Sequence, residues 1–381
     1  MEYALVTGIT GFMGQQFIKE YLERYKNTTV FAIVRNKGNR PAIERVELQM
    51  LKNYIEEGRL VVLGGCMEEC GILDESHKLK LLREKVSEIW HLAGATDFEE
   101  TKRENTFRCN VYGMSHILAL AKQFKKLNAF YHYSTSYISH SGNGLVKVPE
   151  DCLYSCKPEN TNNPYEESKL LGERLMVESG LPYVVFRPSI VMGHSQTGEA
   201  ESDKMVYGAL KCYLWLKQLI MKQEGTAQTK YSVNGLRICA NPLATKNLIS
   251  VDDVIEASLR AREKGDLNLA YNLVNPEPTT VAEICDAIFR TIGADFFVLD
   301  SSVKKENMNK LESLIYRATT LYKPYMLQHD PLWDMTNTLR LMGKKEFHKF
   351  DIELQSRLYK SYIKNRLLSN PYFTKKMQLV N

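Results

Sequence analysis

The stretch Tyr3-Ala4-Leu5-Val6-Thr7-Gly8-Ile9-Thr10-Gly11-Phe12-Met13-Gly14 decides the fold of this chain. Residues 3–7 read as a buried strand, and the amphipathic residues 12–25 read as a helix. Between them, Gly8 turns the chain, Gly11 lets backbone N–H groups approach a pyrophosphate, and Gly14 lets the helix pack closely on the strand. A glycine turn between a first strand and a first helix is typical of dinucleotide-binding folds.

Further apolar runs alternate with segments that can form helices, which predicts an α/β fold with a doubly wound parallel Rossmann sheet. The predicted strands are residues 3–7, 29–34, 60–63, 88–92, 130–134 and 183–186. We expect residues 1–190 to form an NADP-binding domain with the catalytic helix. Residues 191–300 would form a smaller substrate lobe, partly interleaved with that domain, with helices at 205–223 and after Asp252 and Thr280 and a short strand near 236–239. Residues 301–381 would be a helical, basic extension without strands.

Tyr165 and Lys169 are one helical turn apart, so a phenol and an ammonium share one helix face. A fixed positive charge stabilises phenolate, which predicts a lowered tyrosine pKa and a proton donor for a carbonyl. The same spacing recurs at Tyr207/Lys211 and Tyr372/Lys376, which we interpret as ordinary helix surface. Only Tyr165 follows a predicted strand that ends in a hydroxyl cluster, Ser134-Thr135-Ser136.

The second predicted strand ends in Val34-Arg35-Asn36-Lys37, where NAD-binding folds usually offer a carboxylate to the ribose. Arginine favours a 2′-phosphate, so we expect NADPH rather than NADH as the cofactor. The alternative is that Arg35 is a solvated loop residue.

The composition, 381 residues with 44% apolar side chains and a net charge of +5, favours a globular protein without a nucleic-acid partner. The chain enters a strand at once and holds no apolar run long enough to cross a bilayer, so we expect a cytoplasmic protein with reduced cysteines. Cys66/Cys70 and Cys152/Cys156 share a C-x3-C spacing, but zinc sites favour tighter knuckles or nearby histidines, so we expect no metal.

Residues 341–381 carry nine basic and three acidic side chains, a net charge of +6. Apolar residues recur there at helical spacing: Leu354, Leu358, Tyr359, Tyr362, Ile363 and Leu367. This pattern indicates a terminal helix packed on its own domain, or alternatively one that binds an acyl carrier protein, a CoA phosphate or an anionic membrane surface. A second apolar stripe could line an acyl channel, belong to the core or form a homodimer face: Met205, Tyr207, Tyr213, Leu214, Trp215, Leu216 and Leu219.

Residues 3–295 resemble the extended short-chain dehydrogenase/reductase family. The resemblance rests on five ordered motifs: His91-Leu92-Ala93-Gly94, Asn110-Val111-Tyr112-Gly113, Pro164-Tyr165-Glu166-Glu167-Ser168-Lys169, Arg187-Pro188-Ser189-Ile190-Val191-Met192-Gly193 and Val251-Asp252-Asp253-Val254. Within that family the chain is most similar to fatty acyl-CoA reductases of the male-sterility type and to thioester reductase domains. That likeness rests on residues 187–199, on Asn247-Leu248-Ile249-Ser250-Val251-Asp252 and on Tyr322-Lys323-Pro324-Tyr325.

The resemblance implies roles for particular residues. Thr135, with Ser136 as the reserve, would be the catalytic hydroxyl, Tyr165 the proton donor and Lys169 the ligand of the nicotinamide ribose, with Asn110 in support. The implied cofactor-binding residues are Thr7, Gly8, Thr10, Gly11, Phe12, Met13, Gly14, Arg35, Leu92, Ala93, Gly94, Lys169, Pro188 and Ser189. The chain departs from its relatives at Gly65-Cys66, where an Asp commonly meets the adenine.

The implied activity is hydride transfer from NADPH to the carbonyl of an acyl thioester, giving an aldehyde or an alcohol without a cysteine nucleophile. A ketone reductase acting on a steroid-, flavonoid- or polyketide-like substrate is the alternative. A nucleotide-sugar epimerase or dehydratase ranks lower, because a dehydratase would carry an Asp-Glu pair where Ser136-Tyr137 stands and an epimerase an acidic residue where Arg35 stands. A protein that binds NADPH and catalyses nothing is a further alternative.

Overall fold

A seven-stranded parallel sheet forms the centre of the protein in a computed structural model of the chain. The structure describes residues 2–371 and residue 373, except for residues 37, 39, 47–48, 70, 74–77, 140–145 and 225–234. The strand order is β12-β7-β5-β4-β1-β2-β3, with every neighbouring pair parallel. The strands are β1 (Glu2–Thr7), β2 (Thr28–Val34), β3 (Leu60–Gly64), β4 (Glu88–His91), β5 (Ala129–Tyr133), β7 (Tyr183–Pro188) and β12 (Leu269–Leu273). The predicted fold class and all six predicted strands are confirmed.

The seventh strand, β12, was not predicted as part of this sheet. It lies at the sheet edge beside β7, although it comes from the part of the sequence assigned to the second lobe. Its sequence, Leu-Ala-Tyr-Asn-Leu, mixes a polar residue into a short apolar run, so its pattern alone does not indicate a buried parallel strand.

Helices cover both faces of the sheet, because successive residues of a strand point to opposite faces. The helices around the sheet are α1 (Phe12–Arg24), α2 (Gln49–Glu56), α3 (Lys78–Lys85), α4 (Arg103–Phe107), α5 (Gly113–Ala121), α6 (Pro164–Glu178), α9 (Val251–Lys264) and α13 (Thr336–Met342). In β1, Ala4 and Val6 contact the apolar cluster formed with α1 and α9, whereas Leu5 contacts the cluster formed with α3 and α5. Short 3-10 turns are Ile43–Val46, Glu100–Lys102, Ser136–Ser139, Cys152–Tyr154, Pro158–Asn160, Lys305–Asn307 and Thr320–Tyr322.

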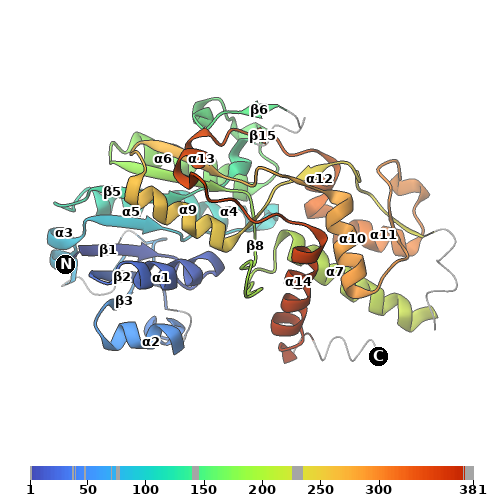
Figure 1. The fold of residues 1–381 in the computed structure, drawn as a ribbon, viewed down its shortest axis with the longest axis horizontal. Helices are drawn as coiled ribbons and strands as arrows, with labels where there is room; N and C mark the ends of the chain where they lie inside the picture. The colour runs from blue at the N-terminus through green and yellow to red at the C-terminus, as the bar shows by residue number, and fades with distance from the viewer. Residues whose placement is uncertain are drawn as a thin grey trace.

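A second lobe of helices lies beyond the carboxyl ends of the strands, on the right of Figure 1. Its helices are α7 (Met205–Glu224), α10 (Val281–Ile292), α11 (Lys310–Ala318), α12 (Lys323–Leu327) and α14 (Ile352–Tyr362), the last followed by a π turn, Ile363–Leu367. Four small two-stranded pairings accompany them: β8 (Ile190–Met192) with β11 (Leu248–Ser250), β9 (Leu236–Ile238) with β14 (Phe297–Leu299), β10 (Thr245–Lys246) with β13 (Thr279–Thr280), and β6 (Lys147–Val148) with β15 (Leu332–Trp333). Among the described residues, no helix is both long and apolar enough to span a bilayer.

Residues 301–371 do not stand apart from the rest of the protein. Helix α13 packs on α9 and β12, whereas α14 packs on α10 and α7 of the lobe. The expectation that this region contains no strand is wrong, because β15 pairs with β6. A two-residue strand leaves no alternating pattern in a sequence, so only the fold reveals it. The apolar face of α14 is buried as predicted, through Leu354, Leu358, Tyr359 and Tyr362.

Backbone atoms closely surround Gly8 and Gly14 in the first glycine turn. Gly8 has a left-handed φ of +82°, and a Cβ built on it would lie 2.5 Å from the Ala93 nitrogen at the end of β4. A Cβ on Gly14 would lie 2.0 Å from the Gly8 carbonyl oxygen. The strand, the turn and α1 therefore fit together only with glycine at both positions.

We expect Gly8→Ala to destabilise the protein by about 2 kcal/mol or more beyond Gly180→Ala, measured by urea unfolding. Gly180 has a similar φ of +75°, but no atom lies within 4 Å of the place that its Cβ would take, so it isolates the cost of the left-handed backbone from that of the clash. Equal destabilisation by the two substitutions would show that the contact with Ala93 is not the constraint.

Candidate active site

A cavity of about 480 Å³ opens at the carboxyl ends of β1, β4, β5 and β7. Its wall includes many of the predicted site residues: Gly8, Gly11, Phe12, Met13, Gly14, Leu92, Gly94, Thr135, Tyr165, Lys169, Pro188 and Ser189. Thr7, Thr10, Arg35, Ala93, Asn110 and Ser136 were also predicted, but they do not line it. We call this space the central cavity.

Tyr165 lies in the first turn of α6, where the sequence starts a helix firmly. Pro164 occupies the first helical position, and the Asn163 side chain accepts a hydrogen bond of 3.1 Å from the Glu166 backbone N–H. This start fixes Tyr165 at the wall of the central cavity, which also includes Thr135 at the end of β5. Tyr165 and the predicted hydroxyl therefore line the same space.

The electrostatics of this pair differ from the sequence-based expectation. Burial raises the pKa of Tyr165 to about 12, and the nearby Thr135 hydroxyl opposes this increase only in part. Lys169 was expected to lower the tyrosine pKa, but it is not among the groups that shift it. Its Nζ donates to the Tyr133 carbonyl oxygen over 2.8 Å, and burial lowers the pKa of Lys169 to about 8. The ammonium is thus directed to the β5 backbone, and desolvation dominates the pKa of both groups.

The geometry separates Thr135 from Ser136. The Thr135 Oγ1 donates to the Pro188 carbonyl oxygen over 3.3 Å and accepts from the Tyr137 N–H over 3.3 Å, which fixes it at the cavity wall. Ser136 is buried away from that wall, and its hydroxyl has no hydrogen-bond partner within the described part of the chain. The catalytic role of Thr135 remains a prediction, and Ser136, its reserve, does not line the cavity.

Asn110 lies behind the cavity and ties two of its walls together. Its Oδ1 accepts from the Ala95 N–H over 2.8 Å, and its Nδ2 donates to the Ala95 carbonyl oxygen and to the Ser168 hydroxyl over 2.9 Å and 2.8 Å. The residue belongs to a π turn, Arg108–Tyr112, which breaks the regular helix between α4 and α5. Asn110 therefore connects the segment after β4 to α6.

Thr7, at the end of β1, also lies behind the cavity, as Asn110 does. Its hydroxyl is 2.8 Å from the His91 Nδ1 and accepts a hydrogen bond of 3.3 Å from the Ala93 N–H. Thr7 is fully buried, so it shapes the end of β4 from behind rather than facing the cavity.

A buried ion pair fixes α6 against the sheet. The Arg187 guanidinium donates to the Glu173 carboxylate through Nε, over 3.0 Å and 3.2 Å to its two oxygens, and also through Nη2. Its Nη1 donates to the Glu150 carbonyl oxygen over 2.7 Å. Both side chains are at most 2% exposed. In the Arg-Pro segment, Arg187 therefore holds α6 to the sheet, whereas Pro188 and Ser189 line the cavity.

Several residues of the cavity wall were missed from the sequence. Tyr325 of α12 donates a hydrogen bond to the buried Glu166 carboxylate, and it accepts one of 2.7 Å from the Asn163 Nδ2. The Phe98 ring stacks between two tyrosines, 5.8 Å from the centroid of Tyr165 and 5.8 Å from that of Tyr325. Both Glu166 and Tyr325 stood inside motifs that the sequence singled out, but nothing in the sequence indicated that they meet.

The interpretation of Tyr207/Lys211 as ordinary helix surface is wrong for the tyrosine. Tyr207 is 1% exposed, lines the central cavity and accepts a hydrogen bond of 2.9 Å from the Gly193 N–H. Tyr213 and Leu216 of the same stripe belong to the lobe core, whereas Met205 lines the cavity. Tyr372 and Lys376 lie outside the described residues.

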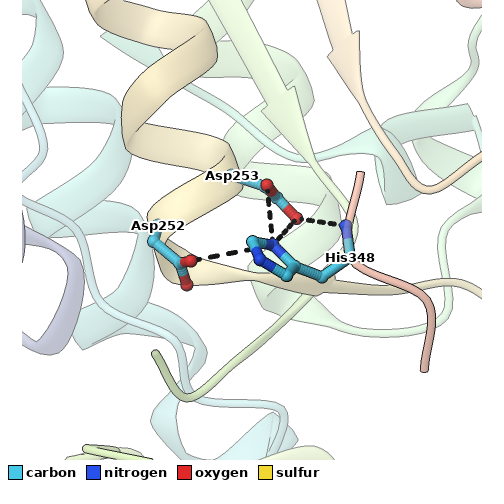
Figure 2. A group of neighbouring side chains, drawn as sticks. All are labelled: Asp252, Asp253 and His348. Atoms are coloured by element: carbon cyan, nitrogen blue, oxygen red, sulfur yellow. Dashed lines mark hydrogen bonds and ion pairs between the residues drawn. The ribbon is translucent and has the colours of Figure 1, made fainter. Parts of the chain in front are cut away.

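A separate polar cluster fastens the carboxyl-terminal region to the start of α9, as Figure 2 shows. The His348 Nδ1 is 3.0 Å from both carboxylate oxygens of Asp253, and its Nε2 is 3.2 Å from the Ser195 hydroxyl, which donates to Asp252 over 2.6 Å. The His348 N–H also donates to Asp253 over 2.9 Å. Ligand atoms of Asp252, Asp253 and His348 lie within 4.8 Å of one another, but hydrogen bonds within the protein already engage them. We therefore interpret the cluster as a clamp between chain segments.

With this geometry established, comparison with known proteins assigns the family. The family described as male sterility protein matches residues 6–257. The chain belongs to this family. The resemblance inferred from the motifs is confirmed, because its relatives include fatty acyl-CoA reductases and reductase-containing peptide synthetases.

Relatives of this male sterility family member align over part of their length. Drosophila melanogaster CG8303, named as a candidate fatty acyl-CoA reductase, is 28% identical over 287 residues, which are 67% of this chain and 50% of that one. The nonribosomal peptide synthetase asaC of Aspergillus flavus is 29% identical over 219 residues, 52% of this chain and 20% of that protein. The chain thus spans about half or less of the length of the curated relatives it matches.

Solved structures share the fold. The terminal R domain from the myxalamid PKS-NRPS biosynthetic pathway has a TM-score of 0.72 at 21% identity, covering 96% of this chain and 91% of that chain. UDP-glucuronic acid 4-epimerase from Bacillus cereus, in complex with NAD, has a TM-score of 0.63 at 18% identity, covering 95% and 96% of the two chains. At these identities the likeness concerns the fold alone.

The buried Glu166 should make stability depend on pH. Burial raises its pKa to about 7 from an ordinary value of 4.5, so the folded protein retains a proton that the unfolded chain loses between these values. The protonated Glu166 contributes its full stability to the fold below pH 4.5, and this contribution is lost as the pH rises through about 7.

We therefore expect Glu166→Gln, which cannot ionise, to gain stability relative to wild type between pH 4.5 and pH 8, by on the order of 1–3 kcal/mol in urea unfolding. Glu178→Gln, at the exposed end of the same helix, controls for the loss of one carboxylate. A difference between Glu166→Gln and wild type that stays constant with pH would contradict the raised pKa.

Proposed function

We propose that this protein is an NADPH-dependent reductase that transfers hydride to the carbonyl of an acyl thioester. One observation carries the proposal: Thr135 and Tyr165 line one cavity together with the glycine turn after β1. Lys169 lines the same cavity, one helical turn from the phenol. Membership of the male sterility family supports a reductase of this type.

The residues of the cavity suit a nicotinamide dinucleotide. Gly8, Gly11 and Gly14 line the cavity with backbone alone, and the start of α1 presents backbone N–H groups and a positive dipole end to a pyrophosphate. Gly94, Pro188 and Ser189 would border the nicotinamide side of the site, and Lys169 would hold its ribose. When bound, the reduced nicotinamide supplies the hydride.

The side chains of the protein then supply the proton and the positioning. Thr135 and Tyr165 would donate hydrogen bonds to the carbonyl oxygen, which becomes an oxyanion as the hydride adds to the carbon. A phenol with a pKa of about 12 is protonated at neutral pH, so Tyr165 can hand its proton to that oxyanion. Burial lowers the pKa of Lys169 to about 8, so this ammonium would release a proton near neutral pH more readily than an ordinary lysine does.

For a thioester, these steps produce a hemithioacetal. It collapses by cleavage of its carbon–sulfur bond to an aldehyde and a free thiol, and a second hydride and proton would give the alcohol. The wall beside Tyr165 suits an acyl substrate, because Phe98, Met205 and Tyr325 give it an apolar side. The names of the relatives, fatty acyl-CoA reductases and nonribosomal peptide synthetases, support a thioester over a simple ketone.

A group of arginines at the end of β2 supports NADPH. The Arg35 guanidinium forms an ion pair with Glu68 over 3.0 Å. The backbone carbonyl oxygen of Arg35 accepts a hydrogen bond of 2.6 Å from the Arg45 side chain. Desolvation lowers the pKa of Arg45, and the nearby charges of Arg35 and Arg40 lower it further. Three neighbouring positive charges suit a 2′-phosphate better than a ribose hydroxyl.

We expect Tyr165→Phe to lower the turnover number by about 10²–10⁴-fold, because it removes the proton donor and leaves the ring. Turnover is followed by loss of NADPH absorbance with an acyl thioester, and NADPH affinity is measured separately by fluorescence titration and should change little. Tyr154→Phe, at a tyrosine that is 65% exposed, serves as the matched control. Retention of most of the activity in Tyr165→Phe would contradict the mechanism.

For Arg35→Ala we expect a lower affinity for NADPH relative to NADH, by about tenfold in the ratio of the two dissociation constants. Arg290→Ala removes an equally charged, 70% exposed side chain from α10 and should leave the ratio as it is. An unchanged ratio in Arg35→Ala would show that another residue reads the 2′-phosphate or that none does.

A further inference from the structure

We propose that Cys152 and Cys156 form a redox-active dithiol, a modification site at which a peroxide oxidises the two thiols to an intramolecular disulfide. Neither cysteine lines the central cavity, and the proposed reduction uses neither of them. The site is therefore independent of the proposed function.

The two sulfur atoms already lie close together. The Cys156 N–H donates to the Cys152 carbonyl oxygen over 3.1 Å, which closes a single helical turn, and the Cys156 thiol donates to the Cys152 sulfur over 3.7 Å. A disulfide requires about 2 Å between the sulfurs and a Cα–Cα distance of about 4–7 Å. Residues four apart in a helical turn meet the second condition, so side-chain rotation with a small shift of the turn can meet the first.

The surroundings of Cys152 favour its thiolate. The hydrogen bond from the Cys156 thiol lowers the pKa of Cys152, and the Arg187 guanidinium, whose Nη1 lies 3.4 Å from the Cys152 sulfur, lowers it further. Burial and the Glu173 carboxylate act in the opposite direction, but the net shift of the Cys152 pKa is downward. Cys152 is therefore the nucleophile of the pair, because the thiolate is the reactive form of a cysteine.

Cys156 has the complementary role of a resolving thiol. Its hydrogen bond with Cys152 and its burial raise the pKa of Cys156, so this thiol keeps its proton while Cys152 is reduced. Oxidation of Cys152 removes the neighbouring thiolate and makes the Cys152 sulfur electrophilic. Cys156, already in contact with that sulfur, can then attack it.

The dithiol lies one layer beneath the protein surface. Cys152 is 5% exposed and Cys156 7%, but both belong to a short surface segment whose other residues include exposed ones: Asp151, Tyr154, Ser155 and Lys157. Local opening of such a short turn is enough to admit a molecule as small as hydrogen peroxide. Cys285 has the same 5% exposure, but it lies inside α10, where a local opening of this kind is not available.

The two thiols together supply two electrons to the peroxide. The Cys152 thiolate attacks one peroxide oxygen, the O–O bond breaks, and Cys152 becomes a sulfenic acid while the released hydroxide takes up a proton and leaves as water. The Cys156 sulfur then attacks the Cys152 sulfur, the S–O bond breaks, and a second water leaves with the proton of the Cys156 thiol. One peroxide is thus reduced to two waters, and an added thiol can reduce the disulfide again.

The modification site adjoins the ion pair that fastens α6. The guanidinium that faces Cys152 is the one that pairs with Glu173 and holds the helix carrying Tyr165. The Arg174 side chain of the same helix donates to the Cys156 carbonyl oxygen over 2.5 Å. Both ends of the dithiol are therefore in contact with side chains that connect to α6.

The experiment treats the full chain with hydrogen peroxide, alkylates the remaining thiols, digests the protein with trypsin and measures the peptide masses. Trypsin leaves both cysteines in one peptide, because no lysine or arginine lies between them. In wild type we expect this peptide to escape alkylation, to weigh two hydrogens less than its reduced form, and to regain both thiols with dithiothreitol. Cys285 is the internal reference, and we expect its thiol to be lost at least about tenfold more slowly.

Two serine substitutions separate the roles of the cysteines. Cys156→Ser keeps a hydroxyl that can donate to Cys152 but has no sulfur, so Cys152 should stop at the sulfenic acid, which dimedone traps. Cys152→Ser removes the nucleophile, so Cys156 should remain a thiol. Cys239→Ser, at a half-buried thiol elsewhere in the chain, is the matched control and should leave the disulfide unchanged.

Four results would overturn the inference: retention of both thiols by wild type in peroxide, loss of the Cys285 thiol as fast as that of Cys152, a disulfide from either cysteine to a third one, or undiminished oxidation of Cys156 in Cys152→Ser. The first three are measured on wild type, so the test stands even if a substitution at this buried site prevents folding.

Discussion

The buried pair of Arg187 and Glu173 is the interaction on which the site depends. It joins β7 to α6, the helix that carries Tyr165, Glu166 and Lys169. Isolated charges at such depth are costly, so the pair is stable only because each charge faces the other and the guanidinium also reaches the Glu150 carbonyl oxygen. Loss of one partner from a buried pair typically costs about 3–5 kcal/mol, because the other charge remains buried. The position of the phenol relative to the sheet is therefore tied to an electrostatic requirement of the core.

Around this anchor, three separate parts of the chain make one cavity. The sheet contributes the glycine turn and Thr135, α6 contributes Tyr165 and Lys169, and the carboxyl-terminal region contributes Tyr325 and Arg366. The His348 clamp holds that last region to the start of α9, which itself packs on α1 behind the glycine turn. Residues 301–371 thus belong to the site as much as to the periphery.

Desolvation explains the protonation states that the site presents. Glu166 and Lys169 are buried and Tyr165 is half-buried, and desolvation shifts each pKa toward the neutral form: up for the phenol and the carboxyl, down for the ammonium. A phenol that stays protonated and an ammonium that releases its proton more readily than usual suit a relay that delivers a proton to an oxyanion. The cavity obtains these properties from its depth rather than from direct contact between Tyr165 and Lys169.

The sequence by itself determined the sheet and the local geometry of the site. Continuous apolar runs marked six strands, the glycines at positions 8, 11 and 14 marked the turn after the first strand, and the helical spacing of Tyr165 and Lys169 put both on one face of α6. These features depend on neighbours close in sequence, which is why a pattern can show them. Only the tertiary structure decided that β12 completes the sheet, that Tyr207 is buried, that Tyr325 meets Glu166, that Lys169 bonds the β5 backbone and that Arg366 stands at the cavity. Each of these is a contact between residues far apart in the chain, and the burial that sets their pKa values and partners exists only once the segments have packed together.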